Sequence, residues 1–87
     1  MDEKEQMEKL RQEGFREVYV WEDKPDHDYP NHEHATTTAH VIVRGRMFMT
    51  IGEETKELRA GNRFDIPAHV VHSVRIGPEG CRYIVGE

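Results

Sequence analysis

The sequence predicts a small all-β protein, an antiparallel barrel or sandwich preceded by one short helix. From residue 15 onward, short runs of β-branched and aromatic residues are separated by turn residues about every eight to twelve positions. The first 13 residues instead have the apolar spacing of a helix. A chain of 87 residues is expected to form one domain, with the helix at 1–13 and the β-barrel at 14–87.

The N-terminal segment carries signals for both ends of a helix. Asp2, with Glu5 three positions later, resembles a capping box with an acidic cap. Met7 and Leu10 form a narrow apolar stripe, and Gly14 supplies a stop. A helix of about a dozen residues is marginal alone, so we expect it to pack on the rest of the chain or on a partner.

The rest of the chain alternates between strand-like and turn-like segments. The strand-like segments are 17–21, 36–43, 46–51, 55–58, 63–67, 69–76 and 81–85. Residues 23–31 contain two prolines and predict a loop, and Gly45 is expected to interrupt a strand. Turns are expected at 52–54, at 60–62 and at the Gly-Pro-Glu-Gly segment 77–80.

Three of the six histidines have the spacing of a metal site. His32 and His34 form a His-any-His pair, and alternate residues of a strand point to the same face. His72 lies in another strand-like segment. Three imidazoles that converge from two strands can bind a transition metal, so these three residues are the candidate ligands.

The order of these residues resembles the cupin superfamily, whose first motif contains a His-any-His pair, a glutamate and a closing glycine. The residues that match its two motifs are His32, His34, Gly45, Gly61, Pro67 and His72. The resemblance covers residues 15 to 87 and implies a small jelly-roll barrel. Thr38 occupies the place of the glutamate that commonly completes a three-His, one-Glu metal site in the family.

The resemblance implies a divalent transition metal, namely Zn, Fe, Ni, Cu or Mn, held by the three histidines. A three-His set leaves coordination positions open for water or substrate, and similar cupins include three-His iron oxygenases acting on thiols. One hypothesis is therefore oxygenase- or isomerase-type chemistry on a small molecule. The alternative is a non-catalytic binding or sensor domain whose metal site has degenerated, because Thr38 brings no negative charge.

Further residues are candidates for the lining of the barrel pocket. Met47, Met49 and Thr38 are expected to contact a bound ligand or cofactor, although both methionines also fit an ordinary core. His40 is expected to point inward and is the candidate catalytic residue; the alternatives are a fourth ligand, a hydrogen-bond partner of the site, and an ordinary interior histidine. His69 is expected at the barrel mouth.

Composition limits the partners that we expect. The formal net charge of −5, from 17 acidic and 12 basic residues, argues against nucleic acid. No apolar run approaches the roughly 20 residues of a membrane helix, so no membrane partner is expected. The single cysteine, Cys81, cannot form an internal disulfide, which fits a cytoplasmic protein. A small-molecule ligand is expected, and so is a homodimer, because so short a chain buries a modest core.

Overall fold

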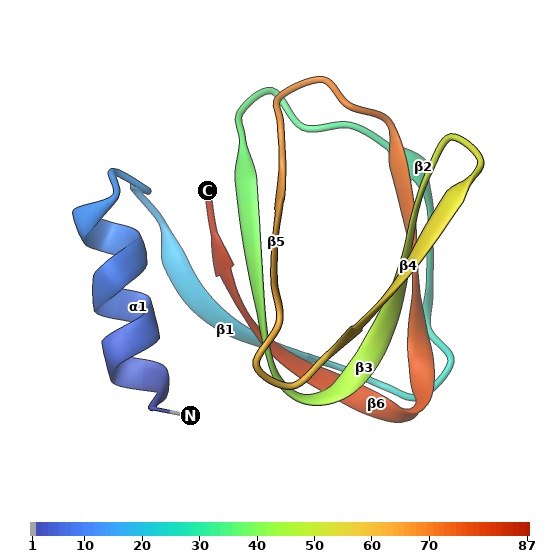
Figure 1. Cartoon of the computed structure of the whole chain (residues 1–87), viewed down its shortest axis with the longest axis horizontal. Helices are drawn as coiled ribbons and strands as arrows, with labels where there is room; N and C mark the ends of the chain where they lie inside the picture. Colours follow the sequence, from blue (N-terminus) through green and yellow to red (C-terminus); the bar gives the residue numbers. More distant parts are fainter. Residues whose placement is uncertain (1) are drawn as a thin grey trace.

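The computed structural model describes residues 2–87, which form one helix and a single antiparallel sheet of six strands (Figure 1). The elements are α1 (Glu3–Gln12), β1 (Val18–Asp23), β2 (Asp28–His32), β3 (Thr38–Ile51), β4 (Glu54–Arg59), β5 (Arg63–Ile66) and β6 (His72–Gly86). The predicted fold class, an all-β domain with a short N-terminal helix, is confirmed.

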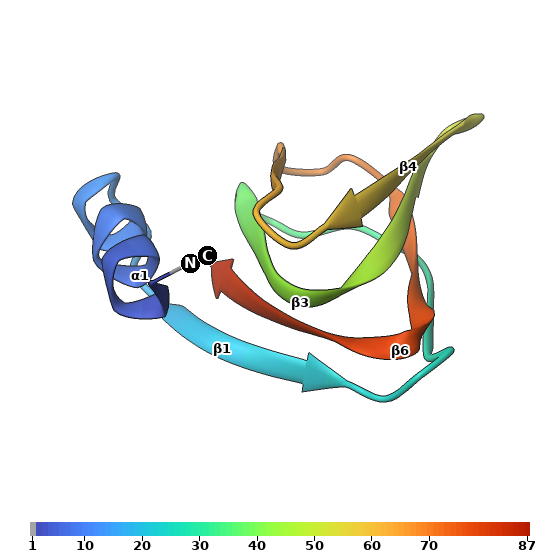
Figure 2. The ribbon, with the colours of Figure 1, turned by 60° about the horizontal axis from the view of Figure 1, so that its bottom comes forward.

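Two long strands, β3 and β6, organise the sheet. They pair with each other along most of their length, while β6 also pairs with β1 and β2, and β3 also pairs with β4 and β5. Because each long strand has different partners at its two ends, the sheet curls around a concave inner face (Figure 2). Within the described part of the chain the curl is not closed into a full barrel.

The structure differs from the predicted elements at three places. Residues 28–32, expected to be part of a loop, form β2 against β6. Pro30 is compatible with this strand because an edge strand can leave one backbone position without a ladder donor. Residues 77–80, expected to reverse the chain, continue β6, and Gly45 does not interrupt β3.

The glycines of these segments allow β3 and β6 to bend together. Their pairing shifts register on both sides of Gly45, between Ile42 and Arg44 and between Gly45 and Met47. Gly45 has a φ of +78°, and a Cβ built there would lie 2.1 Å from the carbonyl oxygen of Gly80. The two backbones can approach this closely only because Gly45 has no side chain.

The two faces of the sheet are covered differently. Alternate residues of β3 and β6 point to opposite faces. Ala39 and Val41 of β3 and Ile84 of β6 pack with Leu10 of α1 on the convex face. Asp2 caps α1 by accepting hydrogen bonds from two backbone amides of its first turn, as predicted. No helix among residues 2–87 is long and apolar enough to cross a membrane.

The concave face holds the larger part of the core and the site described below. Its buried residues are Ile42, Met47, Met49, Leu58, Ile66, Ile76, Cys81, Tyr83 and Val85. They leave one end of the curl unfilled, and this end carries the histidines.

Candidate metal centre and ligand cavity

Three histidines meet at one end of the concave face. His32 is the last residue of β2, and it is paired in register with His72, the first residue of β6. His34 lies two residues beyond the end of β2, in the loop that leads to β3. One ring nitrogen from each histidine lies within 4.8 Å of the other two, so the three are positioned to hold a metal ion.

Backbone carbonyls orient two of the three imidazoles. Nδ1 of His32 lies 2.7 Å from the carbonyl oxygen of Pro30, and Nδ1 of His72 lies 2.9 Å from that of Val70. A carbonyl oxygen only accepts, so in each ring Nδ1 carries the proton and Nε2 keeps its lone pair for a metal. The third ring belongs to His34, whose backbone carbonyl accepts a hydrogen bond of 2.8 Å from the amide of His69.

The donor set fits a divalent transition metal. In a tetrahedral site, ligand nitrogens that are 2.0–2.1 Å from the metal are about 3.3 Å from one another. The three ring nitrogens here are up to 4.8 Å apart, and small rotations of the rings would bring them to that spacing. His72 is buried, and that burial lowers the pKa of its imidazole, which favours the neutral form that binds metal. Its hydrogen bond to the Val70 carbonyl acts in the opposite direction, and His32 and His34 lower the pKa further.

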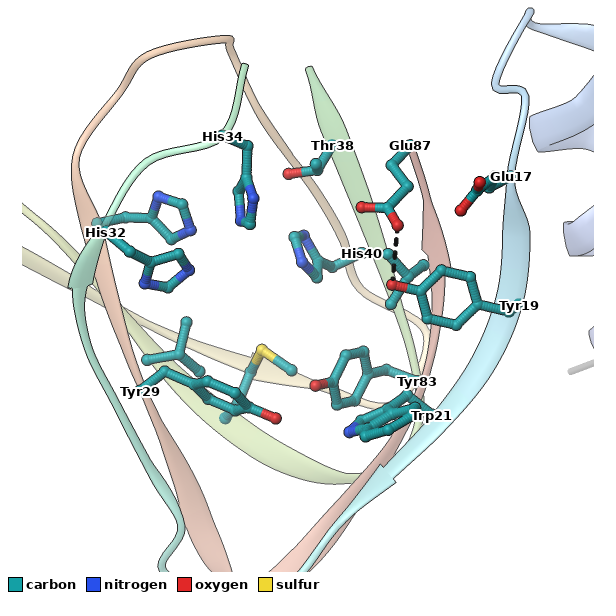
Figure 3. Close-up of a pocket in the computed structure, with 14 residues that line it drawn as sticks. Glu17, Tyr19, Trp21, Tyr29, His32, His34, Thr38, His40, Tyr83 and Glu87 are labelled. Carbon is teal, nitrogen blue, oxygen red and sulfur yellow. Dashed lines mark hydrogen bonds between the residues drawn. The ribbon is translucent and has the colours of Figure 1, made fainter. Parts of the chain in front are cut away.

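The histidines border a cavity of about 450 Å³, which we call the ligand cavity. Figure 3 shows His32 and His34 on one side and the carboxylates of Glu17 and Glu87 on the opposite side. Four aromatic side chains also line it: Tyr19, Trp21, Tyr29 and Tyr83. The ligand cavity therefore has an imidazole end, a carboxylate end and an aromatic wall.

The pairing of β1 with β6 builds the carboxylate end and part of the wall. Glu17 and Glu87 exchange backbone hydrogen bonds of 2.9 and 3.0 Å, so they lie directly opposite each other just outside the assigned strand ends. In the same register Trp21 lies opposite Tyr83. Because side chains alternate along a strand, residues 17, 19 and 21 and their partners 83, 85 and 87 face the same side.

The carboxylate of Asp23 forms hydrogen bonds with three of the four aromatic residues of this wall. Asp23 accepts hydrogen bonds from the hydroxyl of Tyr29 (2.7 Å), the hydroxyl of Tyr83 (2.6 Å) and Nε1 of Trp21 (3.1 Å). Burial, followed by the bond to Asp23, raises the pKa of both tyrosines. These polar tips are directed to Asp23, which leaves ring surface to face the ligand cavity (Figure 3).

The predicted pocket residues separate into two groups. Thr38 and Met47 line the ligand cavity, whereas Met49 is packed in the core and is not part of the lining. Met47 and Met49 share a face of β3 and both lie opposite β4, at Leu58 and Lys56, but only Met47 borders the ligand cavity. His69 lies exposed in the turn before β6, close to Glu33.

His40 lines the ligand cavity, but it lies outside the group of three clustered imidazoles found among residues 2–87. Its Nδ1 is buried and has no hydrogen-bond partner in the described part of the chain. Burial, with a smaller contribution from His72, lowers the pKa of His40 to about 4. His40 is therefore neutral at pH 7 and is suited to a hydrogen bond with a ligand.

Sequence reasoning missed the carboxylate end and the role of Asp23. Glu17 and Glu87 are 70 positions apart (87 − 17), and only the pairing of β1 with β6 brings them together. The sequence held a partial signal for this end of the cavity, because Glu17, Tyr19 and Trp21 are alternate residues of a predicted strand and therefore share one face. Asp23 and Tyr29 lay in the segment interpreted as a loop.

Comparison with known proteins agrees with this architecture. The model of the cupin domain family matches residues 19–86. No curated protein matches the chain significantly. Among solved structures, a cupin superfamily protein from Desulfitobacterium hafniense has 16% identity and a TM-score of 0.71, covering 78% of this chain and 62% of its own.

Two further solved structures are similar. A protein containing a cupin-2 domain from Shewanella frigidimarina has 22% identity and a TM-score of 0.71, with 80% of this chain and 67% of that chain covered. A cupin-like protein from Thermotoga maritima has 25% identity and a TM-score of 0.74, with 80% and 54% covered. The chain thus spans about two thirds or less of the length of these proteins. The family match covers most of the chain and includes all three clustered histidines, and the chain belongs to the cupin family.

Proposed function

We propose that this cupin binds one divalent transition metal through His32, His34 and His72 and presents it to a small molecule held in the ligand cavity. The observation that supports the proposal is the convergence of three imidazole nitrogens within 4.8 Å at one end of a cavity of about 450 Å³. Two of the rings have Nδ1 directed to backbone carbonyls, which leaves Nε2 available as the ligand atom.

The open side of the three-histidine set favours chemistry at the metal over a purely structural role. Structural metal sites are closed by four protein ligands, whereas catalytic sites keep a position free. The bound metal would supply Lewis acidity or dioxygen chemistry of the oxygenase or isomerase type. Around it, the chain orients the ligand against the aromatic wall, and Thr38 and the neutral His40 offer hydrogen bonds.

A second function, non-catalytic binding or sensing, is favoured by one observation. Thr38 stands where the family commonly has a glutamate ligand, so the site has three neutral imidazoles and no anionic donor from that position. A less strongly held metal, or none, would then serve ligand binding alone.

Metal analysis of protein purified without chelator tests the proposal. Wild type should contain about one metal per chain, and His34→Ala should weaken metal binding by more than about 100-fold, since loss of even an outer-shell partner costs about 10- to 100-fold. His69→Ala is the matched control, because it removes a neighbouring exposed histidine that lies outside the cluster. Equal metal content in wild type and His34→Ala would contradict the proposal.

A further inference from the structure

We infer that the small molecule taken by the ligand cavity carries an ammonium group, which binds at the end formed by Glu17, Glu87 and Tyr19. The inference rests on the proposed function in that it names the class of ligand for the same cavity. It is drawn from the charges and aromatic rings at the end opposite the histidines.

Two carboxylates lie directly opposite each other at this end. Glu17 and Glu87 exchange backbone hydrogen bonds and both line the ligand cavity. Like charges directly opposite on an antiparallel pair are destabilising. No Lys or Arg lines the ligand cavity in the described chain, and no ion pair of either glutamate is found there. A cationic ligand would neutralise this pair.

The aromatic wall is suited to the same kind of ligand. The faces of Trp and Tyr rings carry negative charge density and attract cations. Trp21, Tyr29 and Tyr83 are held by Asp23, and Tyr19 donates a hydrogen bond of 3.2 Å to Glu87 (Figure 3). Tyr19 and Trp21 are 36% and 49% exposed, so the wall is accessible from solvent.

A buried polar group points independently to a ligand. The side chain of Thr38 is only 2% exposed, yet its Oγ1 has no hydrogen-bond partner among residues 2–87. Thr38 lines the ligand cavity between His34 and Glu87, and Figure 3 shows its hydroxyl turned toward His34. An unpaired buried hydroxyl is costly, and a polar group of a bound molecule would satisfy it.

The two ends of the ligand cavity thus select different parts of one molecule. The imidazole end offers nitrogen ligands to a metal, and the carboxylate end suits a positive charge. An anionic or fully neutral compound would leave the glutamate pair uncompensated.

Binding of two simple cations to chelator-treated protein tests the inference without the metal. The probes are choline and n-butylamine, each paired with an uncharged analogue of similar shape, neohexyl alcohol and n-butanol. Calorimetry gives the affinities, and fluorescence of the single tryptophan, Trp21 in the wall, gives a second readout. At least one cation should bind about tenfold tighter than its analogue, which corresponds to about 1.4 kcal/mol.

The variant Glu17→Gln/Glu87→Gln should lose this preference and keep or raise the melting temperature, because it removes a repulsion. Glu53→Gln/Glu54→Gln is the matched control, since it removes two exposed charges where the turn after β3 leads into β4 and should retain the preference. A preference below about fivefold for both cations overturns the inference. The inference is also overturned if the preference for cations survives in Glu17→Gln/Glu87→Gln, or if the control variant loses it to the same extent.

The outcome is separable from that of the proposed function. If His34→Ala loses metal but keeps the cation preference, both stand. If wild type binds no metal and still prefers cations, the proposed metal function fails and the ligand class remains. If metal binds and neither cation is preferred, the ligand class alone is overturned.

Discussion

The hydroxyl of Tyr83 donates a hydrogen bond of 2.6 Å to the carboxylate of Asp23, although the two residues are 60 positions apart in the chain. Tyr83 is 6% exposed, so this bond satisfies a buried hydroxyl and links β6 to the end of β1. The same carboxylate also binds Tyr29 and Trp21, and the aromatic wall therefore depends on one residue that is itself outside the cavity lining.

A double-mutant cycle should measure this relationship. Asp23→Ala and Tyr83→Phe, compared singly and together by urea unfolding, are expected to give a coupling energy of about 1.5–3 kcal/mol, the range for a hydrogen bond to a charged group. Asp23→Ala should also change the emission of Trp21, whose Nε1 loses its acceptor. A coupling energy below about 0.5 kcal/mol would mean that the bond does not stabilise the wall.

Substitution of Gly45 should be much more damaging than substitution of an open glycine. Both Gly45 and Gly52 have positive φ, at +78° and +61°, but a Cβ at Gly52 has no atom within 4 Å. Gly52→Ala should therefore cost about 1–2 kcal/mol of unfolding free energy, from backbone strain alone. Gly45→Ala adds the collision with the Gly80 carbonyl and should cost about 3–5 kcal/mol. Urea midpoints measure both, and equal costs would contradict the close approach of β3 and β6.

Burial of His40 should make the metal-free protein less stable in acid. The pKa of His40 in the folded protein, about 4, lies below the ordinary histidine value of 6.5, so the unfolded chain binds a proton first as the pH falls. This contribution is fully present above pH 6.5 and is lost between pH 6.5 and 4, by at most roughly 3 kcal/mol. His72, whose pKa is also lowered, acts in the same direction.

The variant His40→Gln should show a shallower loss of stability over that pH range in buffer containing chelator. His27→Gln, which removes an exposed histidine outside the ligand cavity, serves as control and should keep the wild-type slope. Thermal or urea unfolding at half-unit steps of pH provides the measurement. Identical slopes for His40→Gln and wild type would show that His40 is not buried in its neutral form.

Restoring the family's glutamate at Thr38 should have opposite effects with and without metal. Thr38→Glu adds an anionic donor and should tighten metal binding at least about tenfold, since a carboxylate adds the charge that imidazoles lack. With chelator present, the same carboxylate is buried unpaired and should lower the melting temperature. The variant Thr38→Gln has a side chain of the same size as glutamate but no charge, so comparison with Thr38→Glu isolates the effect of the charge. Tight binding that appears only in Thr38→Glu, and not in wild type, would favour the non-catalytic binding function.

The fold was largely predictable because its signals are local. Alternating strand formers, glycine-rich turns and the cap at Asp2 each lie within a few residues, and the family match supports the architecture that they indicate. Residues 77–80 show where this reasoning fails. They have turn chemistry, but β6 passes through them because its pairing with β3 resumes on both sides. Local preference is overridden by pairing with a strand whose flanking partners, Gly45 and Met47, are 36 and 29 positions away (81 − 45 and 76 − 47).

The candidate site was predictable at its three clustered histidines and at the lining residues Thr38, His40 and Met47 of β3, but not at its carboxylate end. His32 and His34 are neighbours in sequence, and His72 follows from the order of the family motifs. No sequence motif marks the carboxylate end, because Glu17 and Glu87 lie side by side only when the first strand pairs with the last. Met47 and Met49 share a face of β3, and alternation along a strand cannot reveal that only Met47 borders the ligand cavity.

The strand β6 begins at His72 and ends one residue before Glu87, so one continuous element carries both poles of the cavity. Because β6 bends between these two positions (Figure 2), the curl of a single strand fixes how far the carboxylates stand from the histidines.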